Sequence, residues 1–227
     1  MRKEFSDFLA SRELDHLMML RDGIPALDAE DHLAISQLLR EGANHQAIAN
    51  LLMYPELIPD SERVQALLTG LRATSNSYLV LAALVGLGRI PEEALPEPVR
   101  DTVMQEVLRS LRQYGGVIAE RTSVVLADKT WWLLSTPASE LVGLLGHASG
   151  TVRHNVLVAL IPLVGLVHLR GVIAEAVEEG RLSPEAAHEI EEKLKAIDGF
   201  GEDDSVDEAT FDLGMLGMPL LAYIPNL

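Results

Sequence analysis

The stretch of residues 139–166 places the tightest constraint on what this chain can fold into. In its second half, apolar residues recur at gaps of four, three, one and three, counted from Val152, and this is the spacing of a helix face. Residues 147–150 interrupt the pattern, and the hydroxyl side chains on either side of Gly150 suit the start of a helix. We therefore expect two short helices that fold back on one another.

The second of these helices is apolar on nearly all sides. Leu157, Val158 and Ile161 fill most of the circumference that the regular apolar stripe leaves open. A helix of this kind must be covered by several neighbours. Successive helix pairs that bury one continuous core are typical of an α-solenoid. The sequence thus predicts an all-α fold, an α-α superhelix of antiparallel helix pairs.

The same stretch resembles a HEAT repeat. Val152-Arg153 stands where that family opens its second helix, Ala159-Leu160 stands where the buried stripe closes, and Leu144-Leu145 precedes them. The likeness covers about one repeat well. It implies a HEAT-like solenoid that binds macromolecules rather than a particular reaction. It also implies a structural role for Arg153, which would brace the neighbouring turn through hydrogen bonds to carbonyls or a carboxylate.

Two weaker repeats are predicted at 61–89 and 97–135. Ala83-Leu84 and Ala159-Leu160 lie two periods of about 38 residues apart, close to the usual HEAT unit of about 40. Asn76-Ser77 stands where the Val-Arg pair would be, so the first of these repeats depends on its apolar stripe alone. In the second, residues 117–135 are expected to form the longest second helix.

We predict one helical-repeat domain and a distinct C-terminal segment. The domain spans 1–198 and comprises an N-terminal helical cap (1–58), the repeats (61–166) and a charged end cap (169–198). Residues 199–227 form an acidic linker and an apolar tail that packs back on the domain. Two alternatives for the tail are docking of a partner and closure of a dimer, so the oligomeric state stays open. The linker acids do not follow the calcium-binding spacing of an EF-hand.

Composition excludes several classes of function. The net charge of −16 comes without clustered Lys and Arg, which opposes nucleic-acid binding and favours a basic partner. Cysteine is absent, so disulfides, zinc–thiolate sites and thiol catalysis are excluded. No run reaches the roughly 18 apolar residues of a membrane span, and the N-terminus has no apolar signal core. We expect a cytoplasmic protein without membrane association.

No recognised catalytic motif is present. The chain has no HExxH, no GxSxG, no phosphate-binding glycine-rich loop and no paired-carboxylate motif, so we expect no catalytic residues, metal or cofactor. His147 and His154 flank the central turn, with Glu140 nearby. We interpret them as a turn histidine and a surface histidine rather than as metal ligands.

The candidate partner-binding surface lies on the second helices. Arg121, Asp128 and Trp131 recur at seven and three, and we expect them to share one face of the predicted helix 117–135 with Val124. Second helices line the concave side of solenoids in this class, which adds His154 and Asn155 to the surface. Core packing of both tryptophans is the alternative. Neighbouring side chains on a helix lie about 100° apart, so one tryptophan should point away from the core.

Two functions follow as hypotheses. The first is a non-catalytic scaffold or adaptor that binds another protein through the concave face of a HEAT-like solenoid. The second comes from a more general resemblance to the HEAT-like subunits of phycobilin lyases, which implies an accessory protein that handles tetrapyrroles. A cavity beside Trp131 would favour the second hypothesis, and a face filled by side chains would count against it.

Overall fold

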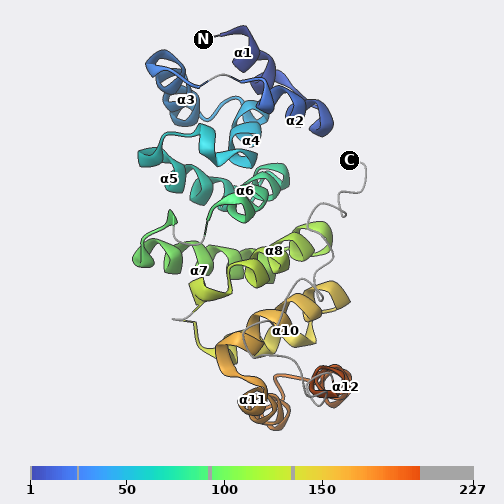
Figure 1. Ribbon diagram of the computed structural model, residues 1–227. Helices are drawn as coiled ribbons and strands as arrows, with labels where there is room; N and C mark the ends of the chain where they lie inside the picture. Colours follow the sequence, from blue (N-terminus) through green and yellow to red (C-terminus); the bar gives the residue numbers. More distant parts are fainter. Residues whose placement is uncertain (1, 25, 92–93, 134–135, 200–227) are drawn as a thin grey trace. The chain divides into compact units, whose positions relative to one another are not determined.

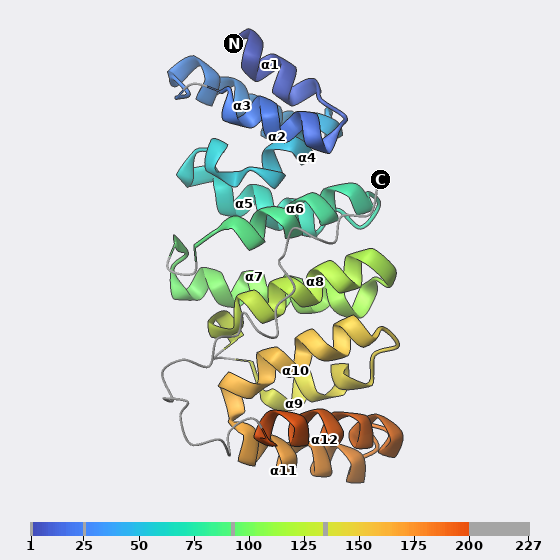
Figure 2. The ribbon, with the colours of Figure 1, turned by 45° about the vertical axis from the view of Figure 1, so that its right-hand side comes forward.

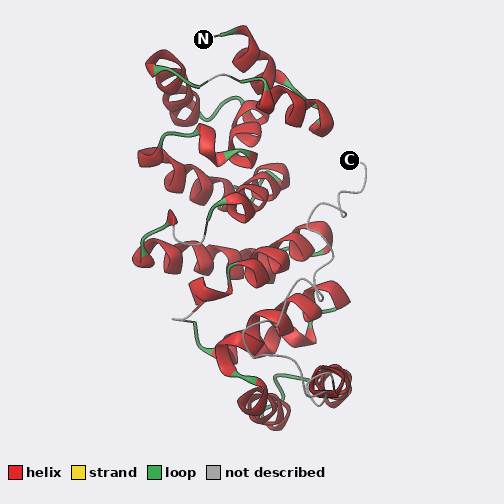
Figure 3. Cartoon of the chain, viewed as in Figure 1, coloured by secondary structure: helices red, strands yellow, loops and turns green. Residues whose placement is uncertain are grey.

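The fold is helical wherever the structure describes it. The computed structural model describes residues 2–24, 26–91, 94–133 and 136–199, and across these ranges it contains α-helices and short 3-10 helices but no strand (Figure 3). The all-α prediction is therefore confirmed. The described chain divides into two compact units, of which the first is Met1–Ser183 and the second begins at Pro184.

In the described residues before position 92, the first unit contains six α-helices. Their bounds are α1 (Lys3–Ala10), α2 (Leu14–Asp22), α3 (Ala29–Glu41), α4 (His45–Met53), α5 (Asp60–Leu71) and α6 (Ser77–Arg89), with the 3-10 helix η1 (Pro55–Leu57) between α4 and α5. The remaining elements of this unit are α7 (Glu97–Gln113), α8 (Gly116–Asp128), η3 (Thr130–Leu133), α9 (Ala138–Val142), η4 (Gly143–Gly146), α10 (Gly150–Val164) and α11 (Leu166–Glu178). Figure 1 colours the chain in sequence order and labels most of these α-helices, and Figure 2 also labels α9.

Local capping explains several of these ends. At the start of α3 the Asp28 carboxylate accepts from the backbone N–H groups of Glu30 and Asp31, and the Asp31 side chain accepts in return from the Asp28 N–H. Gly42 ends the helix in the left-handed region at φ 66°.

Alternate helices of the first unit pack in a row. In chain order, α4 contacts α6, α6 contacts α8, and α8 contacts α10, while α5 packs on α6 and α7 on α8 (Figures 1 and 2). Ala83-Leu84 on α6 and Ala159-Leu160 on α10 are fully buried, as their spacing predicted. Burial of such apolar side chains is the main favourable contribution to folding.

Glycine brings α6 unusually close to its neighbours. A Cβ built on Gly86 would lie 1.9 Å from the carbonyl oxygen of Leu52 in α4. Gly70 of α5 is nearly as crowded, because a Cβ there would lie 2.7 Å from the Leu52 Cδ1 and 2.9 Å from the Ala83 Cβ. The three helices α4, α5 and α6 therefore meet at a point where only glycine fits on two of them.

The predicted long helix over 117–135 is wrong. Helix α8 ends at Asp128, Lys129 leaves the helical region at φ −108° and ψ 35°, and the chain continues as η3. The Thr130 hydroxyl donates to the Ala127 carbonyl at 2.8 Å, and Trp132 turns into the core with 1% of its surface exposed. Burial of that indole overrides the helical pattern. Helix α8 has 13 residues and α7 has 17.

The central stretch forms the predicted reversal, with one modification. Its first half divides into α9 and η4 at Gly143, and its second half is the continuous helix α10. The predicted end cap (169–198) corresponds to α11 and to α12 (Pro184–Gly199), the helix of the second unit, which has proline at its first position. Apart from Gly199, the predicted acidic linker and apolar tail over 199–227 lie outside the described residues.

The helices that the structure describes do not include a candidate membrane span. None of those within the described ranges combines the length and the apolar character that a transmembrane span requires.

Candidate partner-binding surface

The predicted surface comes from three elements that touch one another. Arg121 and Asp128 lie on α8, Trp131 on η3, and His154 and Asn155 on α10. Helix α10 packs against both α8 and η3, so the fold brings these elements together. Trp131 does not continue the face of Arg121 and Asp128, because the helix has ended before it.

Polar side chains join α8 to α10. Asn155 Nδ2 donates to Ser123 Oγ at 2.9 Å, and that hydroxyl donates to the Glu120 carbonyl at 2.7 Å. Ser149 Oγ donates to the Glu120 carboxylate at 2.9 Å at the start of α10. Asn155, predicted as a partner-binding residue, is therefore engaged in the helix–helix contact.

The two adjacent tryptophans have opposite environments. Trp131 is 52% exposed, and Trp132 is buried. The expectation that one of them points away from the core is confirmed. The Lys129 ammonium lies 2.6 Å from the Asp128 carboxylate and 5.9 Å from the centre of the Trp132 ring. Asp128 is thus paired with a buried lysine next to the exposed indole.

The Arg121 side chain on α8 packs against α6 and is partly buried. Its Nη2 lies 4.0 Å from where a Cβ on Gly88 would stand, which places the guanidinium against the end of α6. Its Nε is buried and has no hydrogen-bond partner among the described residues. Burial lowers the pKa of Arg121, the charge of Arg89 lowers it further, and Asp128 opposes the shift.

Arg89, the last residue of α6, is the neighbour that sequence reasoning missed. Its guanidinium carbon lies 4.1 Å from the centre of the Tyr54 ring, and Tyr54 packs edge-on against Phe8 at 5.7 Å. Burial raises the pKa of Tyr54, and the positive charge of Arg89 opposes that rise. We call Arg89 and Arg121 the arginine pair. They are far apart in sequence, and only the packing of α6 on α8 brings them together.

The residues at the central turn make structural contacts. Arg153 Nη1 donates to the carbonyls of His147 at 2.9 Å and Ala148 at 3.1 Å, a bracing role of the kind that the resemblance implies. His147 Nδ1 accepts from the Ser149 N–H at 3.0 Å, and Glu140 pairs with Arg112 at 2.9 Å. His154 is partly buried on α10. The described residues contain no group of three His, Cys, Asp or Glu placed to hold a metal ion.

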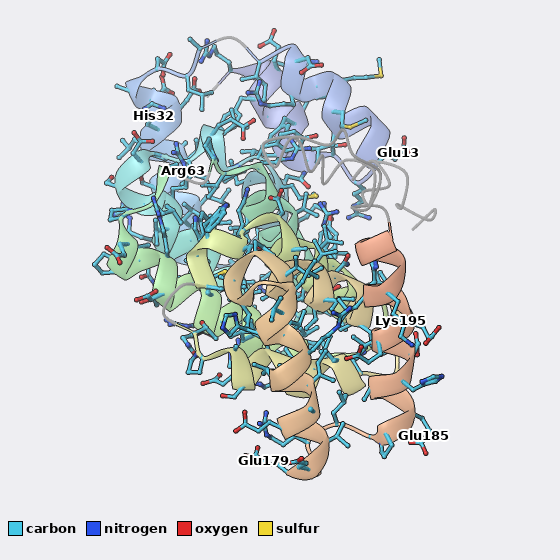
Figure 4. The ribbon with its side chains drawn as sticks, turned by 60° about the horizontal axis from the view of Figure 1, so that its bottom comes forward. Glu13, His32, Arg63, Glu179, Glu185 and Lys195 are labelled. Atoms are coloured by element: carbon cyan, nitrogen blue, oxygen red, sulfur yellow. The ribbon has the colours of Figure 1, made fainter. Side chains whose placement is uncertain are left out.

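This bracing by arginine recurs at two other helix starts. Arg63 Nη2 donates to the Ile58 carbonyl at 3.0 Å, and Arg100 Nε donates to the Leu95 carbonyl at 2.6 Å. Each of the three arginines is the fourth residue of its helix and donates to the carbonyl five residues before it. Arg63 is labelled in Figure 4. The signal in the sequence is an arginine at this position after a turn, and the HEAT resemblance identifies only Arg153.

A shallow depression of about 480 Å³ lies on α7, and no residue of the predicted surface lines it. Its lining residues are Gln105, Glu106, Arg109, Arg112 and Gln113. Glu106 receives hydrogen bonds from Arg72 and Arg109, both at 2.6 Å. Burial would raise the pKa of Glu106, but these two bonds outweigh it and lower the pKa. The charges in this depression are therefore largely satisfied within the chain.

Comparison of the chain with models of known protein families, with curated proteins and with solved structures gave no match.

Proposed function

We propose that the chain is a HEAT-like α-solenoid that acts as a non-catalytic scaffold and binds another protein through the surface formed by α8, η3 and α10. The row of helices from α4 to α10 supports the repeat architecture, because each helix covers the next. In such an architecture this surface would lie on the concave side.

The exposure of Trp131 is the observation that carries the binding role. Tryptophan is enriched among the residues that dominate protein–protein affinity, and an indole that is 52% exposed leaves much apolar surface in water. Asp128 and His154 lie on α8 and α10, the elements next to η3, and a polar rim of this kind is typical of protein–protein interfaces. The net charge of −16 favours a partner with a basic segment, because long-range attraction raises the rate of encounter.

Affinity capture from the native cell, followed by mass spectrometry, tests this function. Trp131→Ala should lower recovery of the specific partner at least tenfold, as expected for a central aromatic contact. Val167→Ala is the matched control, because Val167 is an 80% exposed apolar residue on α11, outside the surface. If Trp131→Ala and the unchanged chain recover the same amount of partner protein, the assignment of this surface as the binding site is wrong. The triple replacement of Arg121, Asp128 and His154 by Ala provides a second test with the same expected direction.

The tetrapyrrole hypothesis stays a prediction. The depression on α7 is not lined by Trp131, so it does not supply the cavity that this hypothesis expects.

A further inference from the structure

Helix α2 has an outward face that carries two methionines and a carboxylate. The buried Leu17 marks the side of α2 that packs on α1, the helix with which α2 makes most of its contacts. On the other side, Met18 is 42% exposed and Met19 is 74% exposed. Residues three and four apart are neighbours on a helix, so the exposed Asp22 lies on the same face as both methionines. We call these three residues the methionine face.

Exposed thioether side chains suit contact with another helix. Methionine is unbranched and polarisable, so it adapts to apolar side chains of different shapes and is common on surfaces that bind helices. Two neighbouring methionines on α2 leave apolar surface in water, and a partner that covers them removes this surface from solvent. An amphipathic helix makes such contacts with side chains three and four residues apart.

The charge on the methionine face is negative. Asp22 forms no ion pair within the described residues, and Arg21, which precedes it, is paired with Glu56 Oε1 at 2.9 Å. Arg12 and Glu13, just before the helix, carry opposite charges and balance one another. Asp22 and the net charge of −16 therefore attract a partner with positive side chains.

We propose that the methionine face binds a basic amphipathic helix of a partner protein. Apolar side chains of that helix cover the two methionines, and a lysine or arginine beside them pairs with Asp22. Two other occupants fit the charge poorly. Residues 200–227 of the same chain carry six acids and no base, and a second copy carries the same net charge of −16. This inference does not rest on the surface formed by α8, η3 and α10.

Nuclear magnetic resonance of the methionine methyl groups tests the proposal on the full chain. The probe is a synthetic amphipathic helical peptide of leucine and lysine, and its matched control has glutamate in place of lysine. With the lysine peptide we expect saturable shifts of the Met18 and Met19 methyl signals, and no shift of the buried Met53 and Met104. Absence of a saturable shift, or equal affinity for the glutamate peptide, overturns the proposal.

Two measurements on the free chain show whether another occupant covers the methionine face. Nuclear Overhauser effects from the Met18 and Met19 methyl groups to the ring of Phe211 or Tyr223 would assign the face to the C-terminal segment of the same chain. Methyl shifts that change with protein concentration would assign it to a second copy. Either result overturns the proposal, and the absence of both supports it.

Substitutions then locate the binding, with affinity for the lysine peptide measured by calorimetry. Replacing Met18 and Met19 together by Ser should weaken it at least tenfold. Asp22→Asn should weaken it about two- to fivefold, as expected for one exposed charge pair. Val167→Ser on α11 and Glu185→Gln on α12, labelled in Figure 4, are matched controls, because each changes an exposed side chain of the same character on another helix. Equal losses in the controls would overturn the assignment.

Discussion

The carbonyl oxygen of Leu52 in α4 lies 1.9 Å from where a Cβ on Gly86 in α6 would stand. No real Cβ can occupy that distance from a backbone oxygen, so a side chain at position 86 must push the two helices apart. Neither partner can yield by rotating a side chain, because the contact is between backbones. This makes Gly86 the residue that sets the spacing of α4 and α6.

Gly86→Ala should therefore destabilise the chain. Alanine favours the helix by about 1 kcal/mol over glycine, but forced separation of packed helices should cost more than that gain, for a net loss of about 1–3 kcal/mol. Gly171→Ala on α11 is the matched control, because nothing lies within 4 Å of a Cβ there, and it should stabilise by up to about 1 kcal/mol. Urea unfolding measures the free energy of unfolding of Gly86→Ala and of Gly171→Ala. A neutral Gly86→Ala would show that α4 and α6 are not held this closely.

Asn50 is a buried polar residue whose replacement should release α1. Its Nδ2 donates to the carbonyls of Phe8 and Ser11, both at 2.9 Å, at the C-terminal end of α1. Asn50→Leu leaves those carbonyls without this donor, and we expect a loss of about 1–3 kcal/mol. Hydrogen exchange should speed up in α1 more than in α10. Gln65→Leu, on the exposed face of α5, should change neither rate, and equal protection of α1 in both variants would contradict the role.

Asp31 should make stability fall in acid. Burial alone would raise the pKa of this carboxyl, but hydrogen bonds from Arg2 and from the Asp28 N–H outweigh burial and lower the pKa below its usual value. A lowered pKa in the folded state adds stability above the ordinary value of about 3.9, and this stability is lost as the pH falls through the folded-state pKa.

The comparison is between the unchanged chain and Asp31→Asn. We expect the free energy of unfolding to decline less steeply between about pH 5 and pH 3 in the variant, because one proton-linked group is gone. Some decline should remain, since Glu106 also has a lowered pKa. Identical slopes in the two proteins would show that the contact between Arg2 and Asp31 does not persist in solution.

Features encoded within a few residues could be predicted from the sequence. Asp28 and Gly42 are residue types that favour the start and the end of a helix, and they bound α3, because capping depends on the residues at the helix ends themselves. The inward positions of Ala83-Leu84 and Ala159-Leu160 followed from helical periodicity. Local patterns of this kind hold when no tertiary contact competes with them.

Features that depend on distant packing could not be predicted. The end of α8 at Asp128 follows from the burial of Trp132, which the apolar spacing of residues 117–135 does not reveal. The approach of Arg121 to Arg89 requires the contact between α6 and α8. The sequence around Asn50 does not indicate that its side chain bonds the end of α1, because that contact depends on how α1 packs on α4. In each case the structure depends on a residue that lies in another helix or beyond the end of the helix in question.

The arginines at the fourth residue of α5, α7 and α10 have a consequence for how the chain reaches its fold. Each closes a loop of only five to eight residues, and loops of this size form within about 100 ns. These turns need no contact with later parts of the chain. Because both partners of each bond lie within one short stretch of sequence, we expect these turns to form before the contacts between helices that are distant in sequence.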